Sequence, residues 1–443
     1  MKLYSEIHRP QFHFSAKENW INDPNGLVYC DGIWHLFFQH NPESNIWGNM
    51  TWGHAISHDL IRWEQAEHAL YPDEHGTMFS GSAVIDHKNS AGFGKGAMLL
   101  FYTAAGDCVL PERPYTQCLA HSTDNGVTVQ KYGGNPIIGN FAKGNRDPKV
   151  IWHEESKQWI MALYLIDNEY CLLRSRDCKT WERFQDLTLP GVTECPDFFP
   201  LTDDSGSLRW VFWGAKGKYL IGSFDGSKFV AETETLTSEC GSNGYAAQTW
   251  SDAPDGRIIQ VSWMNKGLYP EMPFNHQMSI PVELSLHGSA KDVRLVRWPV
   301  KECESLRKKT LRLNTQQIAD WKSPLVIEIQ SDLMEVSLSA VRRAGGRLHM
   351  SIRGQAVIID WEKGELVYQG NRVALPNSQT IELLMLIDKA SFADPPLEDF
   401  EFSNFSKHGI RLRVLRLDKM DTDIGGNKLF KLKYNIEKIL KNI

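Results

Sequence analysis

Short hydrophobic runs, separated by Gly, Asp, Asn and Pro, dominate the chain up to about residue 300. Such runs are typical of β-strands bounded by turns, and helical periodicity is scarce in this region. One kind of run recurs five times, as GIWHLFFQ (32–39), GAMLLFYT (96–103), KQWIMALY (157–164), SLRWVFWG (207–214) and GRIIQVSWM (256–264). The pattern predicts an all-β architecture made from a repeated unit.

A second element follows each of the first four runs. It is Ser-x-Asp leading into a turn, at Ser57–Asp59, Ser122–Asp124, Ser175–Asp177 and Ser223–Asp225. An aspartate in such a turn accepts a hydrogen bond from the backbone two residues on. Hairpins of any β-protein look alike, but the fixed order of the two elements favours a five-bladed β-propeller, in which four-stranded sheets surround a central channel.

The pattern changes beyond residue 300. A charged segment, 301–309, is expected to form a short linking helix, and alternating runs of the kind found in half-buried strands follow at 325–329, 334–340, 348–352 and 356–360. They predict a C-terminal β-sandwich. We therefore expect a propeller over 1–300, a linker over 301–311 and a sandwich over 312–443. The basic stretch 425–443 is expected to be a terminal helix or an edge strand.

Composition and charge narrow the class of partner. The net charge is −6, which argues against a nucleic acid or an anionic membrane surface as the partner. No apolar run is long enough for a transmembrane helix, and the N-terminus lacks the apolar core of a signal peptide. With Met1 as the natural start, a cytoplasmic location is expected. The chain has 15 Trp, 13 Tyr and 20 Phe, which fit either stacking on sugar rings or the core of a large β-fold.

Metal and cofactor chemistry is not indicated. The eight cysteines form neither a CxxC pair nor a zinc-type spacing, so we expect free thiols, no metal site and no cofactor. Four histidines lie close together in the sequence, at His35, His40, His54 and His58. Metal binding is one interpretation, but strand alternation places some of them on opposite faces, which favours a structural role.

Three carboxylate motifs each precede a repeat strand: WINDPNG (20–26) with Asp23, RDP (146–148) with Asp147, and ECPD (194–197) with Glu194. Because the inner strands of a propeller converge, the three acids are expected to meet in one pocket. Burial and mutual repulsion raise carboxyl pKa values, which can provide an acid and a base at one pH. Two carboxyls flanking a bond are the working groups of a glycosidase. The alternative is that they are turn residues that cap the backbone.

The motifs resemble glycoside hydrolase family 32, whose members include invertases, inulinases, levanases and sucrose-6-phosphate hydrolases. They occur in the family's order from about residue 8 to 300, as WINDPNG, FFQHNP (37–42), WGNMTWGHAISHDLIRW (47–63), FSGSA (79–83), RDPKV (146–150), ECPDFF (194–199) and YAAQTWSD (245–252). The resemblance implies a five-bladed propeller followed by a β-sandwich, and a small carbohydrate as the substrate.

The resemblance also implies roles for the acids. Asp23 resembles the nucleophile, Glu194 the general acid/base and Asp147 the transition-state stabiliser of a retaining mechanism. Retention predicts nucleophile and acid/base carboxyls about 5–5.5 Å apart. Arg146 is expected to keep Asp147 ionised, because an adjacent cation lowers a carboxyl pKa. Cys195 is expected to pack rather than react.

Further positions match the part of the family that holds the fructosyl unit. They are Asn22, Gln39, Trp47, Phe79, Ser80 and Arg146, joined by Tyr245, which is expected to tune the acid or the nucleophile, and by Trp263. Amides and hydroxyls suit a neutral polyol, which offers donors and acceptors but no charge. For Trp47, core packing is the alternative.

The sequence leaves alternatives for the C-terminal part of the chain and for the substrate. Residues 388–404 resemble a family strand pair interrupted by an insertion, and the tail after 410 matches poorly, which leaves open the boundary of the second domain and any dimer built through it. The chain is expected to be a monomer or a homodimer. The expected activity is release of terminal β-fructofuranosyl units from sucrose, fructo-oligosaccharides or fructans. The alternatives are a sucrose-6-phosphate hydrolase, for which Lys143, Lys216 and Lys218 would form a phosphate site, a fructosyltransferase, or an inactive sugar-binding propeller.

Overall fold

The computed structural model describes residues 3–269, 271–288, 292–313, 331, 333–341, 346–352, 355–375, 380–388, 402–403 and 410–417. Every element in these residues is a β-strand or a short 3-10 helix, which confirms the all-β prediction. The chain divides into two compact units, one of Phe12–Glu302 and one of Met1–Gln11 with Cys303–Ile443.

The strands of the first unit form five successive sheets in the described residues. The first holds β1 (Asn19–Cys30), β2 (Ile33–Asn41), β3 (Thr51–Ser57), β4 (Glu64–Gln65) and β20 (Phe274–Asn275). The second holds β5 (Thr77–Asp86), β6 (Ala97–Ala105), β7 (Thr116–Ser122) and β8 (Gln130–Lys131). The third holds β9 (Arg146–His153), β10 (Gln158–Ile166), β11 (Glu169–Ser175) and β12 (Glu182–Thr188).

The fourth sheet holds β13 (Asp197–Thr202), β14 (Leu208–Gly214), β15 (Lys218–Phe224), β16 (Phe229–Ala231) and β17 (Leu236–Thr237). The fifth holds β18 (Gly244–Thr249), β19 (Ile259–Met264), β21 (Val282–His287) and β22 (Arg294–Pro299). Two 3-10 helices, η1 (Gly106–Cys108) and η2 (Pro254–Gly256), lie in loops. Pairing within the sheets is antiparallel except between β1 and β20.

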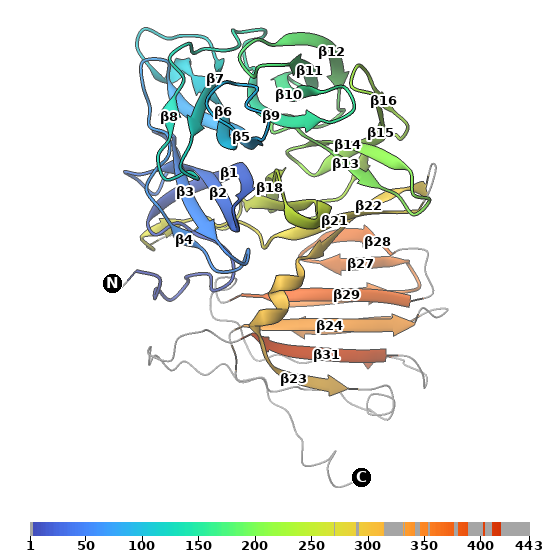
Figure 1. Ribbon diagram of the computed structural model, residues 1–443. Coiled ribbons are helices and arrows are strands. Elements are labelled where there is room, and N and C mark those ends of the chain that lie inside the picture. The colour runs from blue at the N-terminus through green and yellow to red at the C-terminus, as the bar shows by residue number, and fades with distance from the viewer. Residues whose placement is uncertain are drawn as a thin grey trace. The chain divides into compact units, whose positions relative to one another are not determined.

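The first strand of each sheet lies nearest the centre of the unit (Figure 1). β1 contacts β5, β5 contacts β9, β9 contacts β13, β13 contacts β18, and β18 contacts β1 again. This closed ring is the arrangement of a β-propeller. The five recurrent runs of the sequence are the second strands of the sheets, β2, β6, β10, β14 and β19.

The Ser-x-Asp elements end the third strands. In three sheets the serine hydroxyl donates to the aspartate two residues on, at 3.2, 2.7 and 3.0 Å (Ser57–Asp59, Ser122–Asp124, Ser175–Asp177). In the fourth sheet Asp225 instead accepts from the backbone and hydroxyl of Ser227. The carboxylate thus closes the turn in all four cases.

Hydrophobic clusters fill the space between neighbouring sheets. One joins the first and second sheets through Phe37, Trp52, Leu100 and Tyr102. Others join the second and third, the third and fourth, and the fourth and fifth sheets. Trp52 and Trp213 are among the largest fully buried side chains. Much of the aromatic content is therefore core, which stabilises the ring of sheets by removing apolar surface from water.

The second unit contains two further sheets in its described residues, preceded by the 3-10 helix η4 (Lys301–Leu306). One holds β23 (Arg307–Leu313), β31 (Ile410–Leu417), β24 (Met334–Val341) and β29 (Thr380–Ile387). The other holds β28 (Asn371–Ala374), β27 (Glu365–Tyr368), β26 (Gln355–Asp360), β25 (Arg347–Ile352) and β30 (Phe402–Ser403).

Both sheets of this unit contribute to one core, which contains Val336 and Leu338 of β24, Met350 of β25 and Ile359 of β26. Shared burial of this kind is the arrangement of a β-sandwich. The predicted strands at 334–340, 348–352 and 356–360 are confirmed, and the predicted linking helix is the 3-10 helix η4. The predicted strand at 325–329 and the stretch 425–443 lie outside the described residues.

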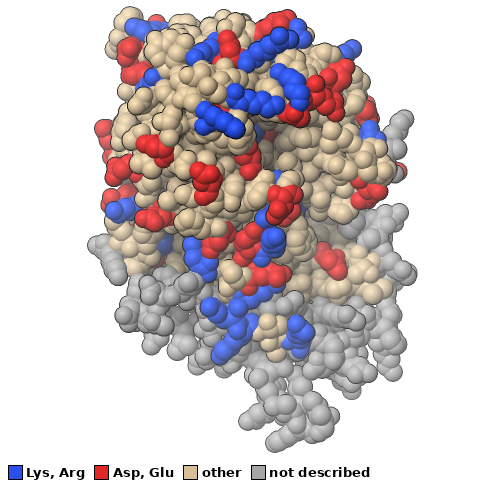
Figure 2. All heavy atoms as spheres, in the orientation of Figure 1, with Lys and Arg blue, Asp and Glu red and all other residues tan. Residues whose placement is uncertain are grey.

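Acidic and basic side chains lie interspersed on the face of the molecule shown in Figure 2. Among the residues that the structure describes, no helix combines the length and the hydropathy needed to cross a bilayer.

Candidate active site

The three predicted acids come together at the starts of the inner strands. Asp23 lies in β1, Asp147 is the second residue of β9, and Glu194 lies in the turn just before β13. Sγ of Cys195, the neighbour of Glu194, lies 3.6 Å from Asp23 Oδ2 and 3.5 Å from Asp147 Oδ2. The structure therefore brings residues from three sheets into one cluster.

The backbone at this site adopts an uncommon conformation. Asp147, Glu194 and Cys195 have φ of 64°, 66° and 42°, in the left-handed region that non-glycine residues rarely occupy. Such conformations cost of order 1–3 kcal/mol each and persist where surrounding contacts fix them. Here Thr103 Oγ1 accepts from Asp147 N at 3.0 Å, and the Tyr170 hydroxyl donates to the Glu194 carbonyl at 3.3 Å.

Hydrogen-bond donors surround the Asp23 carboxylate. Ser80 Oγ donates to Oδ2 at 2.6 Å and Asn22 Nδ2 donates to Oδ1 at 3.2 Å. Trp20 Nε1 in turn donates to Asn22 Oδ1 at 2.9 Å and so fixes the amide. Burial raises the pKa of Asp23, the Ser80 bond opposes the rise, and the Glu194 charge adds to it.

Asp147 lies deeper than Asp23 and is buried. Burial raises the pKa of its carboxyl to about 7, against the lowering effect of the Arg146 guanidinium and with the added effect of Glu194 and Asp23. Arg146 Nε lies 3.8 Å from Asp147 Oδ2, and the Cys195 amide donates to the same oxygen at 3.0 Å. Arg146 therefore counteracts burial but does not restore an ordinary pKa.

Glu194 is held from two sides. Arg146 NH2 lies 2.5 Å from Oε1, and the Tyr245 hydroxyl donates to Oε2. Burial raises the pKa of Tyr245, so its hydroxyl keeps its proton and serves as a donor. The Arg146 guanidinium also lies over the Tyr164 ring, 4.7 Å from the centroid, which fixes the cation between the two acids.

Three other predicted binding residues, Trp47, Gln39 and Trp263, make contacts of their own. Trp47 is 53% exposed and packs edge-on against Phe79 with a centroid distance of 6.0 Å, so it is not a core residue. Gln39 is buried and donates from its amide to the Met78 carbonyl at 2.8 Å. Trp263 packs edge-on against Tyr245 at 6.1 Å.

Several residues that hold the site were not predicted. Thr103 and Tyr164 lie in the repeat strands β6 and β10, and Tyr170 lies in β11, where the sequence shows only hydrophobic runs. Cys195 was expected to pack rather than react, and the sequence did not predict its contacts with two carboxylates. The packing of neighbouring sheets determines these contacts, and no local sequence motif predicts them.

The clustered histidines include one hydrogen-bonded pair. Nδ1 of His35 lies 3.0 Å from Nε2 of His54, and both side chains are buried. Burial lowers the pKa of both, that of His35 to about 4 and that of His54 to about 3. Within the described residues, no group of three or more His, Cys, Asp or Glu side chains is arranged to hold a metal ion.

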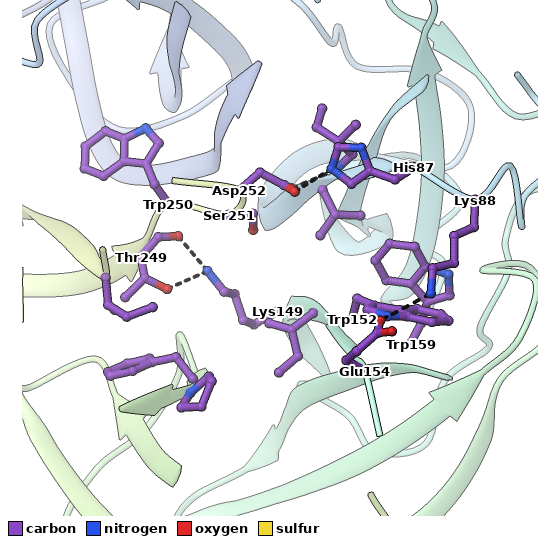
Figure 3. Close-up of a pocket in the computed structure, with 16 residues that line it drawn as sticks. His87, Lys88, Lys149, Trp152, Glu154, Trp159, Thr249, Trp250, Ser251 and Asp252 are labelled. Carbon is purple, nitrogen blue, oxygen red and sulfur yellow. Dashed lines mark hydrogen bonds and ion pairs between the residues drawn. The ribbon is translucent and has the colours of Figure 1, made fainter. Parts of the chain in front are cut away.

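A cavity of about 330 Å³ lies further along the same inner strands, lined by residues such as Val84, Phe199 and Thr249. Figure 3 shows Lys149 at this cavity, with its ammonium directed at the oxygens of Thr249 at 2.7 and 3.0 Å. Lys149 Nζ also lies 3.3 Å from Asp197 Oδ1, and both side chains are buried. The charged residues that end the RDPK and ECPD motifs thus pair with each other.

Comparison with known proteins gives a consistent result. The model of the glycosyl hydrolases family 32 N-terminal domain matches residues 13–299. A levanase of Bacillus subtilis is 41% identical over 334 residues, which cover 69% of this chain and 48% of the levanase. An extracellular exo-inulinase of Aspergillus awamori is 33% identical over 361 residues, covering 69% of this chain and 67% of the inulinase.

Solved structures agree on the fold. The crystal structure of exo-inulinase from Aspergillus awamori superposes with a TM-score of 0.82 at 24% identity, covering 94% of this chain and 99% of that chain. The sequence match to the levanase spans about half of that protein's own length.

Proposed function

Since this chain belongs to glycoside hydrolase family 32, we propose that it is a retaining β-fructofuranosidase. It releases terminal, non-reducing β-D-fructofuranosyl units from sucrose, fructo-oligosaccharides or fructans of the inulin or levan type. The observation that carries the proposal is the clustering of Asp23, Asp147 and Glu194, each with a different set of hydrogen-bond partners.

Asp23 acts as the nucleophile in this proposal. The donors Ser80 and Asn22 stabilise its ionised form and aim the carboxylate. An Asp23 oxygen bonds to the anomeric carbon as the glycosidic C–O bond breaks, and the departing oxygen takes the proton of Glu194. The product of this step is a fructosyl ester of Asp23 and a free leaving sugar.

Glu194 then acts as the base. As a carboxylate it takes a proton from water, whose oxygen bonds to the anomeric carbon while the ester C–O bond breaks. Fructose leaves, and Asp23 and the protonated Glu194 are restored. Arg146 and Tyr245 hold the Glu194 carboxyl in place during both steps.

Asp147 and Arg146 supply charge and hydrogen bonds to the sugar. The transition state resembles an oxocarbenium ion, which a buried carboxylate stabilises more strongly than a solvated one does. We infer that Asp147 acts as a carboxylate facing the positive charge that develops on the ring, and that it accepts hydrogen bonds from fructosyl hydroxyls. In this proposal Trp47 and Phe79, whose rings pack edge-on against each other, contact the apolar face of the sugar.

The names of the relatives favour fructans among the substrates, because a levanase and an exo-inulinase match this chain. A phosphorylated substrate requires a cationic pocket for its phosphate. Lys143 and Lys216, two of the lysines considered for that role, are exposed on the surface. We therefore propose a non-phosphorylated fructoside, with sucrose 6-phosphate hydrolysis and fructosyl transfer as the competing activities.

Product analysis of the purified protein tests this proposal. We expect free fructose from 1-kestose, inulin or levan, a lower rate on sucrose 6-phosphate than on sucrose, and no activity in the Asp23→Ala variant. Cleavage of sucrose 6-phosphate alone would instead place the enzyme with the phosphorylated substrates. Oligosaccharides that lengthen with sucrose concentration would identify a transferase, and sugar binding without cleavage would show an inactive propeller.

A further inference from the structure

The Cys195 thiol lies between two of the three acids of the proposed site. Its Sγ is 3.6 Å from Asp23 Oδ2 and 3.5 Å from Asp147 Oδ2. Its backbone amide donates to the same Asp147 oxygen at 3.0 Å. Because Cys195 has a left-handed backbone with φ of 42°, the amide and the thiol both reach the Asp147 carboxylate.

This thiol has one proton and two possible acceptors. Burial raises the pKa of Cys195 well above that of a free thiol, and the Asp147 and Asp23 charges raise it further. At neutral pH the group is therefore a protonated S–H donor. A hydrogen bond is strongest when its proton points at a single acceptor, so the two carboxylates compete for this proton.

The two acceptors change in charge during the proposed reaction. In the free enzyme Asp23 is the nucleophilic carboxylate, whereas in the fructosyl-enzyme its oxygen belongs to an uncharged ester. Hydrogen bonds to ionised acceptors are stronger than those to neutral ones. The preferred partner of the thiol therefore changes when the ester forms.

We propose that Cys195 is a positioning residue whose single S–H bond is made to Asp23 in the free enzyme and to Asp147 in the fructosyl-enzyme. The thiol thus helps to keep the nucleophile ionised before attack and supports the stabilising carboxylate afterwards. This inference rests on the proposed function, in which Asp23 forms the ester.

The pH dependence of kcat/KM tests the first half of the proposal, because kcat/KM reports ionisations of the free enzyme. In Cys195→Ala the nucleophile loses a donor, so the acidic limb of the pH profile of kcat/KM should move to higher pH by about 0.5–1 unit. At 1.36 kcal/mol per unit, this shift corresponds to about 0.7–1.4 kcal/mol. Cys195→Ser keeps a donor and should return the limb to within about 0.3 unit of wild type.

A matched control removes a thiol elsewhere. Cys171 is fully buried in β11 within the core between the second and third sheets, and Cys171→Ala should lower stability without moving the limb. The proposal would be overturned if kcat/KM fell in Cys195→Ala while its acidic limb stayed at the pH of wild type. It would also be overturned if the acidic limb lay at the same pH in Cys195→Ala and Cys195→Ser. An inactive wild type would instead refute the proposed function itself.

A second measurement does not depend on the folding of the alanine variant. The Glu194→Gln variant is used as the background, and its fructosyl form is made with an activated aryl fructoside. The S–H stretching band of Cys195 is recorded in the free and the fructosyl form. The band is assigned by infrared difference against the same enzyme that also carries Cys195→Ser. We expect the band to shift between the two states, because the acceptor changes. An unchanged band would contradict the exchange of partners.

Discussion

At the scale of single residues, three carboxyl groups of similar chemistry lie in different environments. Asp23 accepts from a hydroxyl and an amide, Asp147 from a backbone amide, and Glu194 from a tyrosine and an arginine. Because the partners differ, one group is suited to stay ionised while another carries a proton. The motifs predicted which acids meet, but the partners came from strands far apart in the sequence.

Replacing Glu194 separates proton transfer from nucleophilic attack. Glu194→Ala should lower kcat/KM on sucrose by about 10²–10⁴-fold, since general acid catalysis contributes that much. The loss should be far smaller for an aryl β-fructofuranoside whose phenol leaves without a proton. Asp23→Ala should lose activity on both substrates. Initial rates on the two substrates provide the measurement, and equal losses in Glu194→Ala would contradict its role as the acid.

Replacing Asp147 should raise stability in a pH-dependent way. Its pKa is raised from 3.8 to about 7, so the folded state binds this proton more tightly than the unfolded state does. Wild type therefore loses stability as pH rises from about 4 to 7, whereas Asp147→Asn does not. The variant should gain roughly 2–4 kcal/mol over wild type at pH 8 and little below pH 4.

Denaturant unfolding at pH 4, 6 and 8 checks this expectation. Asp255→Asn, a change of an exposed aspartate in a loop, is the matched control and should show no such trend. A gain of equal size at every pH, or a loss at pH 8, would mean that Asp147 is not held in an unfavourable environment.

At the scale of elements, the site depends on where each inner strand begins. In β5, Ser80 reaches Asp23 next to a β-bulge between Phe79 and Gly81. A Cβ atom at Gly81 would lie 1.9 Å from the Phe101 carbonyl oxygen, so the glycine lets β5 approach β6 at this bulge. The FSGSA motif thus combines a functional serine with a structural glycine.

Gly81→Ala should therefore damage both fold and activity. The added methyl group forces β5 away from β6, which should cost about 1–3 kcal/mol and displace Ser80 from Asp23. We expect a lower melting temperature and a kcat/KM reduced about 10–100-fold, the size of effect expected for misplaced reacting groups. Gly133→Ala, where nothing lies within 4 Å of the new atom, should change neither. Wild-type activity in Gly81→Ala would contradict this account of the bulge.

At the scale of the whole molecule, repetition made the fold predictable from sequence. Five similar runs and the recurring Ser-x-Asp turns predicted repeated sheets, and the starts of the inner strands predicted the meeting of the acids. Two features were not predictable: the thiol between Asp23 and Asp147, and the buried Lys149–Asp197 pair. Both depend on how neighbouring sheets pack against one another. The alternating runs likewise predicted strands of the sandwich, but not the order in which they pair.

The most direct test of the central claim is to run the reaction on sucrose in the presence of methanol and to determine the configuration of the methyl fructofuranoside by NMR. Methanol competes with water for a fructosyl-enzyme, and the methyl fructoside, unlike free fructose, keeps its anomeric configuration. A retaining enzyme acting through Asp23 should give methyl β-D-fructofuranoside alongside fructose. Methyl α-D-fructofuranoside, or fructose release that persists in Asp23→Ala, would contradict the account.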